Sequence, residues 1–327
     1  MAKTLNPSLH KLITLLSDGA FHDGTALGLK LGISRTAVWK MIKKLEAYDV
    51  PLQSQKKIGY ALREPLSLLD KTKLKRLLPH KAIKLEIFES LPSTNDYLLA
   101  NKTSQKIQVC LAEQQTKGRG RFHRAWHSPF AQNLYFSVRY AFNTDISELG
   151  GVSLVASLAI AHTLNELKIL PDTILLKWPN DIIYDHKKLA GNLVEVQAET
   201  HDLCQVILGI GINVNMSKAP AQHILQAWTS LRNITGQHFD RTTLAASLLN
   251  NLIIYLARFA ESGLTTFVSE WQKYDALRDK KITLLVGEQS IKGVGCGINA
   301  QGHLLLKRDD TGKIQAFSAG ETTIAKN

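Results

Sequence analysis

The sequence predicts a multidomain α+β protein: a winged helix-turn-helix unit, a large central α+β domain and a small C-terminal β barrel. Its 327 residues exceed what one ordinary hydrophobic core accommodates, so several domains are expected. Apolar residues recur at helical spacing near the N-terminus, whereas short alternating strands separated by turn residues fill the chain after Lys280. The predicted divisions are residues 1–65, a linker helix over 66–81, the central domain over 82–277 and the barrel over 278–327.

The composition is that of a soluble globular protein, with 44% hydrophobic and 21% charged residues. A net charge of +12 favours an anionic partner, which could be nucleic acid, a nucleotide or an acidic protein. Cys110, Cys204 and Cys296 lie far apart, which argues against a zinc site or a disulfide framework. The most apolar stretch, Val152 to Ala161, is too short to cross a bilayer, and no signal peptide is recognised. We therefore expect a cytoplasmic protein that is not bound to a membrane.

Residues 1–65 contain three predicted helices followed by a hairpin. Leucines at helical spacing mark a first helix over Ser8–Ser17, and Gly32 ends a second over Gly24–Leu31. Ser34 caps a third helix, which has one apolar and one basic face. The sequence of residues 52–62 resembles that of a β hairpin. Two helices joined by a glycine-containing turn and followed by a hairpin are typical of a winged helix-turn-helix.

The outer face of the third helix is the predicted DNA-binding surface, because lysines and arginines outnumber acidic residues two to one in this unit. The alternative is an ordinary solvated helix face, as most charge runs are. Two details weaken the DNA-binding interpretation: the hairpin tip at 55–58 lacks a glycine, and Asp49 stands where a helix-ending glycine is favoured. The candidate DNA-binding residues are Ser34, Arg35, Thr36, Lys40 and Lys43.

The central domain mixes strand and helix patterns. The most distinct helix, Gly151–Leu167, is apolar on nearly all sides and should be buried. The helix over 240–261 is amphipathic, and Ser93 begins a short helix that ends near Asn101. Predicted strands cover 107–114, 134–140, 173–178, 189–197 and 203–214, with a hairpin turn at 200–202.

A basic, glycine-rich stretch runs from Lys117 to Trp126 with the sequence KGRGRFHRAW. Glycines let backbone N–H groups approach an anion, and arginines match the geometry of carboxylate and phosphate oxygens. Such a stretch suits a loop that becomes ordered around an anionic ligand. Taken alone it is equally consistent with a solvated basic loop or a nucleic-acid tether.

Four further segments favour the anion-binding interpretation of this loop. They are Lys177–Asp181 (KWPND), Lys188–Gly191 (KLAG), Gly209–Asn213 (GIGIN) and the isolated Trp228. Each has a structural alternative: surface lysines, a β-bulge, or a tryptophan that fills the core. Together they describe a phosphate and carboxylate site beside a planar ligand, since glycines inside a strand permit close approach and an indole can cover a flat ring.

The motifs GRGRxxRxW, KWPND, KLAG, GIGIN and STN, in this chain, resemble those of the biotin–protein ligases over essentially the whole sequence. The N-terminal unit is similar to that of the bifunctional bacterial ligase/repressors. The resemblance implies a central mixed sheet related to class II aminoacyl-tRNA synthetases and an SH3-like C-terminal barrel. It implies two reactions: biotin and ATP form biotinyl-5′-adenylate, and the biotinyl group passes to a lysine of a biotin carboxyl carrier domain.

The resemblance also implies roles for individual residues, with Mg²⁺ accompanying ATP and no metal site formed by the protein alone. The implied catalytic residues are Lys188, Arg119, Arg121 and Lys177. The implied biotin-binding residues are Ser93, Thr94, Asn95, Gln115, Gly118, Arg119, Gly120, Arg121, Lys188 and Gly191. The implied nucleotide-binding residues are Arg121, Trp126, Asn180, Asp181, Asn213 and Trp228.

The chain departs from the family pattern at His123, which replaces a usual glycine, and at Asn192, which replaces a usual aliphatic residue. Phe122 and Ala125 stand where basic residues are common. The expected partners are the carrier domain, operator DNA of biotin-synthesis genes and a second copy of the chain when adenylate is bound. Two alternatives remain: a lipoate–protein ligase of the same fold, and a transcription factor that senses biotinyl-adenylate without transferring it.

Overall fold

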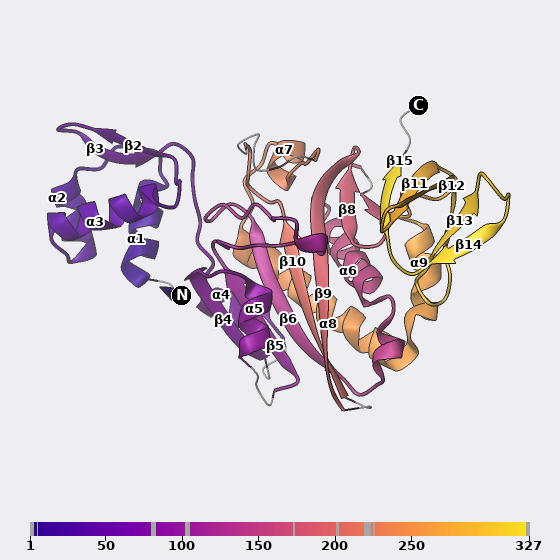
Figure 1. Cartoon of the computed structure of the whole chain (residues 1–327). Helices are drawn as coiled ribbons and strands as arrows, with labels where there is room; N and C mark the ends of the chain where they lie inside the picture. The colour runs from indigo at the N-terminus through magenta and orange to yellow at the C-terminus, as the bar shows by residue number, and fades with distance from the viewer. Residues whose placement is uncertain are drawn as a thin grey trace.

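The computed structural model describes residues 3–4, 6–79, 83–101, 105–172, 174–200, 203–218, 224 and 226–324. An N-terminal helical unit and a C-terminal five-stranded sheet lie at opposite ends of a central domain (Figure 1). The central domain is built on an eight-stranded sheet covered by helices. The structure is therefore α+β, with the mixed central sheet that the sequence predicts.

The N-terminal unit has the three helices and the hairpin expected from the sequence. Side chains of Asn6, Asp23 and Ser34 cap the three helices by accepting hydrogen bonds from N–H groups of each first turn. The hairpin tip lacks a glycine, and Lys57 takes the left-handed conformation there with φ of 67°. Asp49 does the same after the third helix, with φ of 56°. The elements are α1 (Pro7–Leu16), α2 (Gly24–Leu31), α3 (Arg35–Glu46), β2 (Leu52–Gln55) and β3 (Gly59–Leu62).

The central sheet has the strand order β1-β4-β5-β6-β10-β9-β8-β7. Only β4 and β5 run parallel; the other neighbours are antiparallel. The strands are β1 (Lys3–Thr4), β4 (Ile83–Ser90), β5 (Ile107–Ala112), β6 (Leu134–Phe142), β7 (Leu175–Lys177), β8 (Asp181–Tyr184), β9 (Lys187–Thr200) and β10 (Leu203–Ile212). The short β1 therefore ties the N-terminus of the chain to the edge of the central sheet.

Two helices form the main layer over this sheet, and their packing explains their apolar composition. By length and composition, the segments Ile146–Glu166 and Arg241–Ser262 could each cross a membrane, although the helix within the first, α6 (Val152–Glu166), has the extent that the sequence predicts. Both are core helices here, since α6 packs against α8 and β9. The helices of this domain are α4 (Lys71–Leu77), α5 (Thr94–Ala100), α6 (Val152–Glu166), α7 (Leu231–Thr235), α8 (Arg241–Ser262) and α9 (Val268–Gln272), with 3-10 turns η1 (Arg121–His123), η2 (Ile146–Leu149) and η3 (Leu264–Phe267).

The sequence did not reveal β8, and it placed the start of β9 two residues too late. A two-residue turn joins the two strands, and its residues Asp185 and His186 both have positive φ, 47° and 59°. Such turns usually carry glycine, so this one left no signal in the sequence. Strands β1 and β4 and helices α7 and α9 were also not predicted. Of the turn expected at 200–202, residues 201 and 202 lie outside the described residues.

The C-terminal residues form a five-stranded antiparallel sheet in the order β14-β13-β12-β11-β15. Glycines with positive φ lie in the three expected turns, at Gly287, Gly302 and Gly312. Among residues 281–324, no pairing joins β14 to β15, so the sheet is not closed into a barrel by hydrogen bonds. The strands are β11 (Lys281–Val286), β12 (Gln289–Ile298), β13 (Leu304–Arg308), β14 (Ile314–Phe317) and β15 (Glu321–Ile324).

The N-terminal unit is packed firmly onto the central domain. The rings of Tyr48 and Phe130 stack with centroids 4.6 Å apart and an interplanar angle of 6°. Phe130 follows the basic loop in sequence, yet it belongs to the apolar core of the N-terminal unit. The Tyr48 hydroxyl donates to the buried Glu89 at 2.5 Å, and the Lys44 ammonium lies 2.5 Å from the same carboxylate. Burial and Glu89 together raise the pKa of Tyr48 well above its usual range.

A second junction fixes the chain between the two units. Arg241 is almost fully buried and donates to the carbonyl of Ser67 at 2.6 Å and to the Glu113 carboxylate at 2.5 Å. The other oxygen of Glu113 accepts from the N–H of Leu69 at 2.5 Å. Residues 66–70 are therefore held by a buried ion pair rather than left as a loose connection.

Candidate active site

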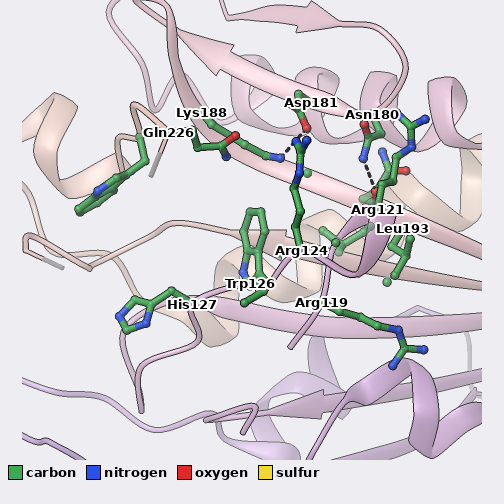
Figure 2. Close-up of a pocket in the computed structure, with 18 of the residues that line it drawn as sticks. Arg119, Arg121, Arg124, Trp126, His127, Asn180, Asp181, Lys188, Leu193 and Gln226 are labelled. Atoms are coloured by element: carbon green, nitrogen blue, oxygen red, sulfur yellow. Dashed lines mark hydrogen bonds and ion pairs between the residues drawn. The ribbon is translucent and has the colours of Figure 1, made fainter. Parts of the chain in front are cut away.

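A cavity of about 870 Å³ lies at the end of the central sheet, beneath the basic loop (Figure 2). Strands β7, β8, β9, β10 and β15, helix α5, the basic loop and Gln115, which follows β5, all contribute to its walls. Gly118 does not line the cavity; it lies in the neck of the loop, where a Cβ would come within 2.8 Å of Ser128 Oγ. The sequence-predicted residues that line it are Ser93, Thr94, Asn95, Gln115, Arg119, Gly120, Arg121, Trp126, Lys177, Asn180, Asp181, Lys188, Gly191, Asn213 and Trp228.

One part of the wall is a network of neutral polar side chains. The Thr94 N–H and hydroxyl donate to Gln115 Oε1 at 2.8 and 3.0 Å. Ser137, which the sequence did not single out, donates from β6 to Thr94 Oγ1 at 2.6 Å or Asn95 Oδ1 at 2.5 Å. Gly209 makes this arrangement possible, because a Cβ there would lie 2.3 Å from Asn95 Oδ1. Gly209 is thus a glycine because the Asn95 side chain lies against it. The sequence alone could not show whether a protein side chain or a ligand comes this close to the strand.

A second part of the wall is cationic, and Lys188 is its most firmly positioned member. Its ammonium lies 2.6 Å from Asp181 Oδ1 and 5.3 Å from the centre of the Trp126 ring. Its backbone N–H donates to Ala227 O at 2.9 Å, and its carbonyl accepts from Thr229 at 2.9 Å. Lys188 is therefore held between β8 and the segment that carries Trp228.

Lys177 and Arg121 bring further positive charge to the same region. Burial lowers the pKa of Lys177 below its usual value, and nearby Lys188 lowers it further, whereas Asp181 opposes the change. Burial likewise lowers the pKa of Arg121, whose guanidinium donates to the Gly320 carbonyl at 3.1 Å. Cations that burial and neighbouring positive charge destabilise in this way are stabilised by an anion placed among them.

The basic loop folds as a small hairpin over the cavity. The Gly120 N–H donates to the Arg124 carbonyl and the Trp126 N–H donates to the Gly118 carbonyl, both at 2.8 Å. At its tip Phe122 and His123 have positive φ of 54° and 57°. Phe122 and His123 are the two residues of the tip that depart from the family pattern. Both adopt a left-handed backbone conformation that favours glycine.

Trp126 returns from the loop into the cavity beside β10. A Cβ at Gly211 would lie 2.5 Å from the Trp126 ring, so this glycine accommodates the indole. The Trp126 Nε1 is buried and has no partner among the described residues. An indole N–H without a partner in a cavity wall is a donor that a ligand can use.

Arg119 differs from the other predicted cations. Its guanidinium lies 2.5 Å from Asp96 Oδ1 and 2.9 Å from Glu195 Oε1. In Figure 2 the side chain extends away from Lys188 and Asp181. The structure thus brings Arg119 to the cavity but directs its charge toward two carboxylates of the protein.

Two predicted nucleotide-binding asparagines are bonded to the protein itself. The Asn213 amide donates to the Thr229 carbonyl at 3.0 Å, and the Asn180 amide donates to the Asn192 carbonyl at 2.7 Å. Asn192 in turn bonds Ser153 and Ser157 of α6, which satisfies this buried polar side chain. These asparagines fix the ends of β8, β9 and β10 around the cavity.

The C-terminal sheet also contributes to the cavity, although nothing in its sequence suggested a catalytic role. Glu321, Thr322 and Thr323 line the wall, and Arg124 lies 2.5 Å from the Glu321 carboxylate. In the sequence, Arg124 is recognisable only as part of the basic loop. Glu321, Asp96 and Glu195 were not predicted, because single acidic residues far apart in sequence carry no motif.

The predicted DNA-binding residues lie at the solvent-exposed start and outer face of α3. Ser34 uses its hydroxyl to cap this helix at 3.1 Å from the Ala37 N–H, and Lys43 lies 2.7 Å from Glu46. Trp39, which the sequence reasoning did not consider, lies on the same face with 48% of its surface exposed. Across the part of the chain that the structure describes, no cluster of three or more His, Cys, Asp or Glu side chains could hold a metal.

Comparison with known proteins connects both surfaces to named families. The model described as "Biotin/lipoate A/B protein ligase family" matches residues 87–213, and an "HTH domain" model matches residues 8–61. The bifunctional ligase/repressor BirA of Escherichia coli is 37% identical over 315 residues, which cover 96% of each chain. That of Bacillus subtilis is 28% identical over 319 residues, covering 95% of this chain and 96% of its own.

A solved structure of the biotin protein ligase from Aquifex aeolicus in complex with biotin and ATP is similar with a TM-score of 0.63. It is 28% identical and covers 75% of this chain and 99% of its own. The biotin–[acetyl-CoA-carboxylase] ligase of Mycobacterium tuberculosis is 31% identical over 242 residues, covering 72% of this chain and 87% of its own.

Proposed function

This chain belongs to the family of bifunctional biotin ligase/repressors, and we propose that it biotinylates a carrier protein with ATP and represses transcription in response to biotin. It is a biotin–protein ligase by its near full-length similarity to ligases. The observation that carries the proposal is the convergence of Lys188, Lys177 and Arg121 on one cavity whose wall also contains a neutral polar network.

The first reaction joins two anions, and the cationic wall suits it. A biotin carboxylate oxygen attacks the α-phosphorus of ATP and forms an O–P bond, while the bond from that phosphorus to the α–β bridging oxygen breaks and pyrophosphate leaves. Positive groups already in place stabilise the charge that develops at phosphorus and oppose the repulsion between the reactants. We assign this task to Lys188, Lys177 and Arg121, with Arg119 at the margin of the cavity.

The polar network suits the ring end of biotin. The ureido group carries one carbonyl acceptor and two N–H donors, and the wall offers hydroxyls and amides of both kinds. We assign biotin binding to Ser93, Thr94, Asn95, Gln115, Gly120, Arg121, Lys188 and Gly191, whereas Gly118 shapes the neck of the loop and Arg119 lies at the margin of the cavity. Trp126, Trp228, Asn180, Asp181 and Asn213, with Arg121, are assigned to the nucleotide side.

A magnesium ion held mainly by the triphosphate fits this cavity. Magnesium commonly takes one or two protein carboxylates together with substrate phosphates, and Asp181 and Glu321 are the carboxylates that line the wall. When bound, Mg²⁺ would neutralise phosphate charge and orient the pyrophosphate leaving group.

The second reaction needs no nucleophile from the enzyme. The amine of a carrier lysine attacks the biotinyl carbonyl carbon of the mixed anhydride, an amide forms and AMP leaves, with loss of the amine proton. We propose a biotin carboxyl carrier domain as the acceptor, in the cytoplasm, and an SH3-like curl of the five C-terminal strands beside the site.

The exposed face of α3 is assigned to operator DNA upstream of biotin-synthesis genes. A dimer would present two such helices to two half-sites. The edge of β9 supports pairing of two copies, since its described pairs with β8 end at Gly191 whereas β9 continues to Thr200.

The test is mass spectrometry of a carrier domain after incubation with the full-length protein, MgATP and biotin. A mass increase equal to one biotinyl group on one lysine is expected. Incubation with lipoate in place of biotin discriminates the alternative within the same family model. Transfer of lipoate instead of biotin, or binding of biotin and ATP without any transfer, would refute the proposed ligation.

A further inference from the structure

The Arg119 side chain forms ion pairs with two elements outside the basic loop. Its Nη1 lies 2.5 Å from Asp96 Oδ1 in α5, and its Nη2 donates to the Glu195 oxygens in β9 at 2.9 and 3.2 Å. The side chain of Arg119 is 24% exposed, and those of Asp96 and Glu195 are 47% and 29% exposed. Arg119 and Glu195 are 76 residues apart in the sequence, and their ion pair holds one side of the loop in place.

The opposite side of the loop is fastened separately. Arg121 donates to the Gly320 carbonyl, and Arg124 pairs with Glu321 of β15. The hairpin bonds of Gly118 and Gly120 keep these two sides of the loop in register. The loop thus spans the cavity with one attachment on α5 and β9 and another on β15.

The charge around Arg119 is already more than balanced. One guanidinium faces two carboxylates, so the cluster as a whole carries about one negative charge and offers no net positive charge to a phosphate. Burial lowers the pKa of Arg119, but the hydrogen bonds that it donates to Asp96 and Glu195 outweigh burial and raise the pKa above its usual value. Its guanidinium therefore stays charged.

The Glu195 carboxylate also orients Asn95, a residue assigned to biotin binding. Glu195 Oε2 accepts a hydrogen bond from Asn95 Nδ2 at 2.6 Å, and Asn95 directly precedes Asp96. Loop closure and the polar network are consequently linked through one side chain.

We propose that Asp96 and Glu195 are positioning residues that hold Arg119 and so keep the basic loop closed over bound biotinyl-adenylate. This rests on the ligase function proposed above, because the adenylate is the ligand that a closed loop retains. Arg119 then acts mainly as a latch, whereas Arg121, Lys177 and Lys188 supply charge to the reacting groups.

Asp96→Asn is the sharpest variant, since it keeps the shape of an exposed side chain and removes only its charge. The matched control is Glu86→Gln, which removes the carboxylate bonded to Tyr97 of the same helix but to no residue of the loop. In the ligand-free full-length protein, trypsin should cleave within residues 117–124 roughly 2- to 5-fold faster in Asp96→Asn, the range expected for one partly exposed ion pair. The control should match the wild type.

The functional readout is release of preformed biotinyl-adenylate after dilution. Release from Asp96→Asn should be faster by a similar factor, while biotin-dependent pyrophosphate formation in a single turnover stays within about twofold of wild type. Arg119→Gln should give the same faster release, and Asp96→Asn should add less in that background than in the wild type. High salt should speed release from wild type more than from Arg119→Gln, because it screens the ion pairs.

Unchanged proteolysis and release in Asp96→Asn would overturn the latch. So would a loss of pyrophosphate formation in Arg119→Gln with release unaltered, because that result assigns the arginine to the reacting phosphate. Absence of any biotin-dependent pyrophosphate from the wild type would instead refute the ligase function, and the trypsin comparison would still test the latch.

Discussion

At the scale of single residues, the site is made of cations whose neighbours decide what each can do. Lys188 and Arg119 look equivalent in the sequence, as basic residues of motifs that contain glycine. The structure separates them, because Lys188 shares one carboxylate, Asp181, with Lys177, whereas Arg119 has two carboxylates of its own. Lys188 and Lys177, which share one carboxylate, therefore leave positive charge available to a ligand, whereas Arg119 with its two carboxylates leaves none.

Replacement of Lys188 tests this distinction. Lys188→Ala should slow adenylate formation by about 100-fold or more, the usual effect of losing one positioned electrostatic group. The measurement is single-turnover, biotin-dependent release of pyrophosphate. Lys187→Ala is the control, because Lys187 is adjacent but pairs with Asp185 in the turn. Near wild-type rates in Lys188→Ala would show that this lysine does not act on the reacting groups.

Lys177 gives a prediction for pH. Burial lowers its pKa, so in the free protein the ammonium loses its proton at a lower pH than an ordinary lysine does. Adenylate formation that needs this charge should therefore decline as the pH rises through that lowered pKa. Lys177→Arg should move the decline to higher pH, since guanidinium keeps its charge. A pH–rate profile that is the same in both proteins would exclude Lys177 as the titrating group.

At the scale of elements, most helices and strands were predictable because their patterns are local. The apolar α6 and the glycine-punctuated C-terminal strands are examples. Strand β8 was missed because its turn uses Asp185 and His186 instead of glycine. The ion pairs of Arg119 and Arg124 could not be predicted, since their acidic partners are brought together only by the tertiary fold.

Helix α3 also carries a residue that its charge pattern obscured. Trp39 is an exposed indole among Arg35, Thr36, Lys40 and Lys43. If α3 enters a major groove, Trp39 reaches base edges and can contact thymine methyl groups. Trp39→Ala should weaken binding to biotin-synthesis promoter DNA of the source organism by about 5-fold or more and leave ligation unchanged. Leu167→Ala, an exposed apolar residue on the central domain, is the control in the same mobility-shift titration.

Replacing thymine by uracil in the bound DNA removes only the methyl groups. Wild-type binding should then weaken while Trp39→Ala is little affected. Equal losses in both proteins would mean that the indole does not read those methyl groups.

At the scale of the whole molecule, the ligand site and the DNA-binding unit are linked by short paths. Glu89 lies four residues before Ser93, and Phe130 lies four residues after Trp126. Both touch Tyr48 of the N-terminal unit. The sequence predicted both units but not this junction, because its members are scattered and none belongs to a motif.

Biotinyl-adenylate should strengthen operator binding, because it neutralises the basic loop and changes the surface available for pairing of two copies. Couplings of this kind are typically worth about 1–3 kcal/mol, or roughly 5- to 150-fold in affinity. The measurement is a mobility-shift titration with and without biotin and ATP. Arg35→Ala should weaken DNA binding in both conditions without affecting ligation. Equal DNA affinity with and without the two substrates would contradict a biotin switch.

The stack of Tyr48 on Phe130 limits how freely this architecture can be rearranged. A ligase designed by deleting the N-terminal unit would expose Phe130 and Ala131, together with the apolar side chains of Leu66 and Leu68, to water. The exposed segment leads directly into the basic loop that lines the cavity, so the deletion should disturb the candidate site and solubility together. A working catalytic fragment, or a chimera with a foreign DNA-binding domain, should therefore need a substitute partner for that one aromatic ring.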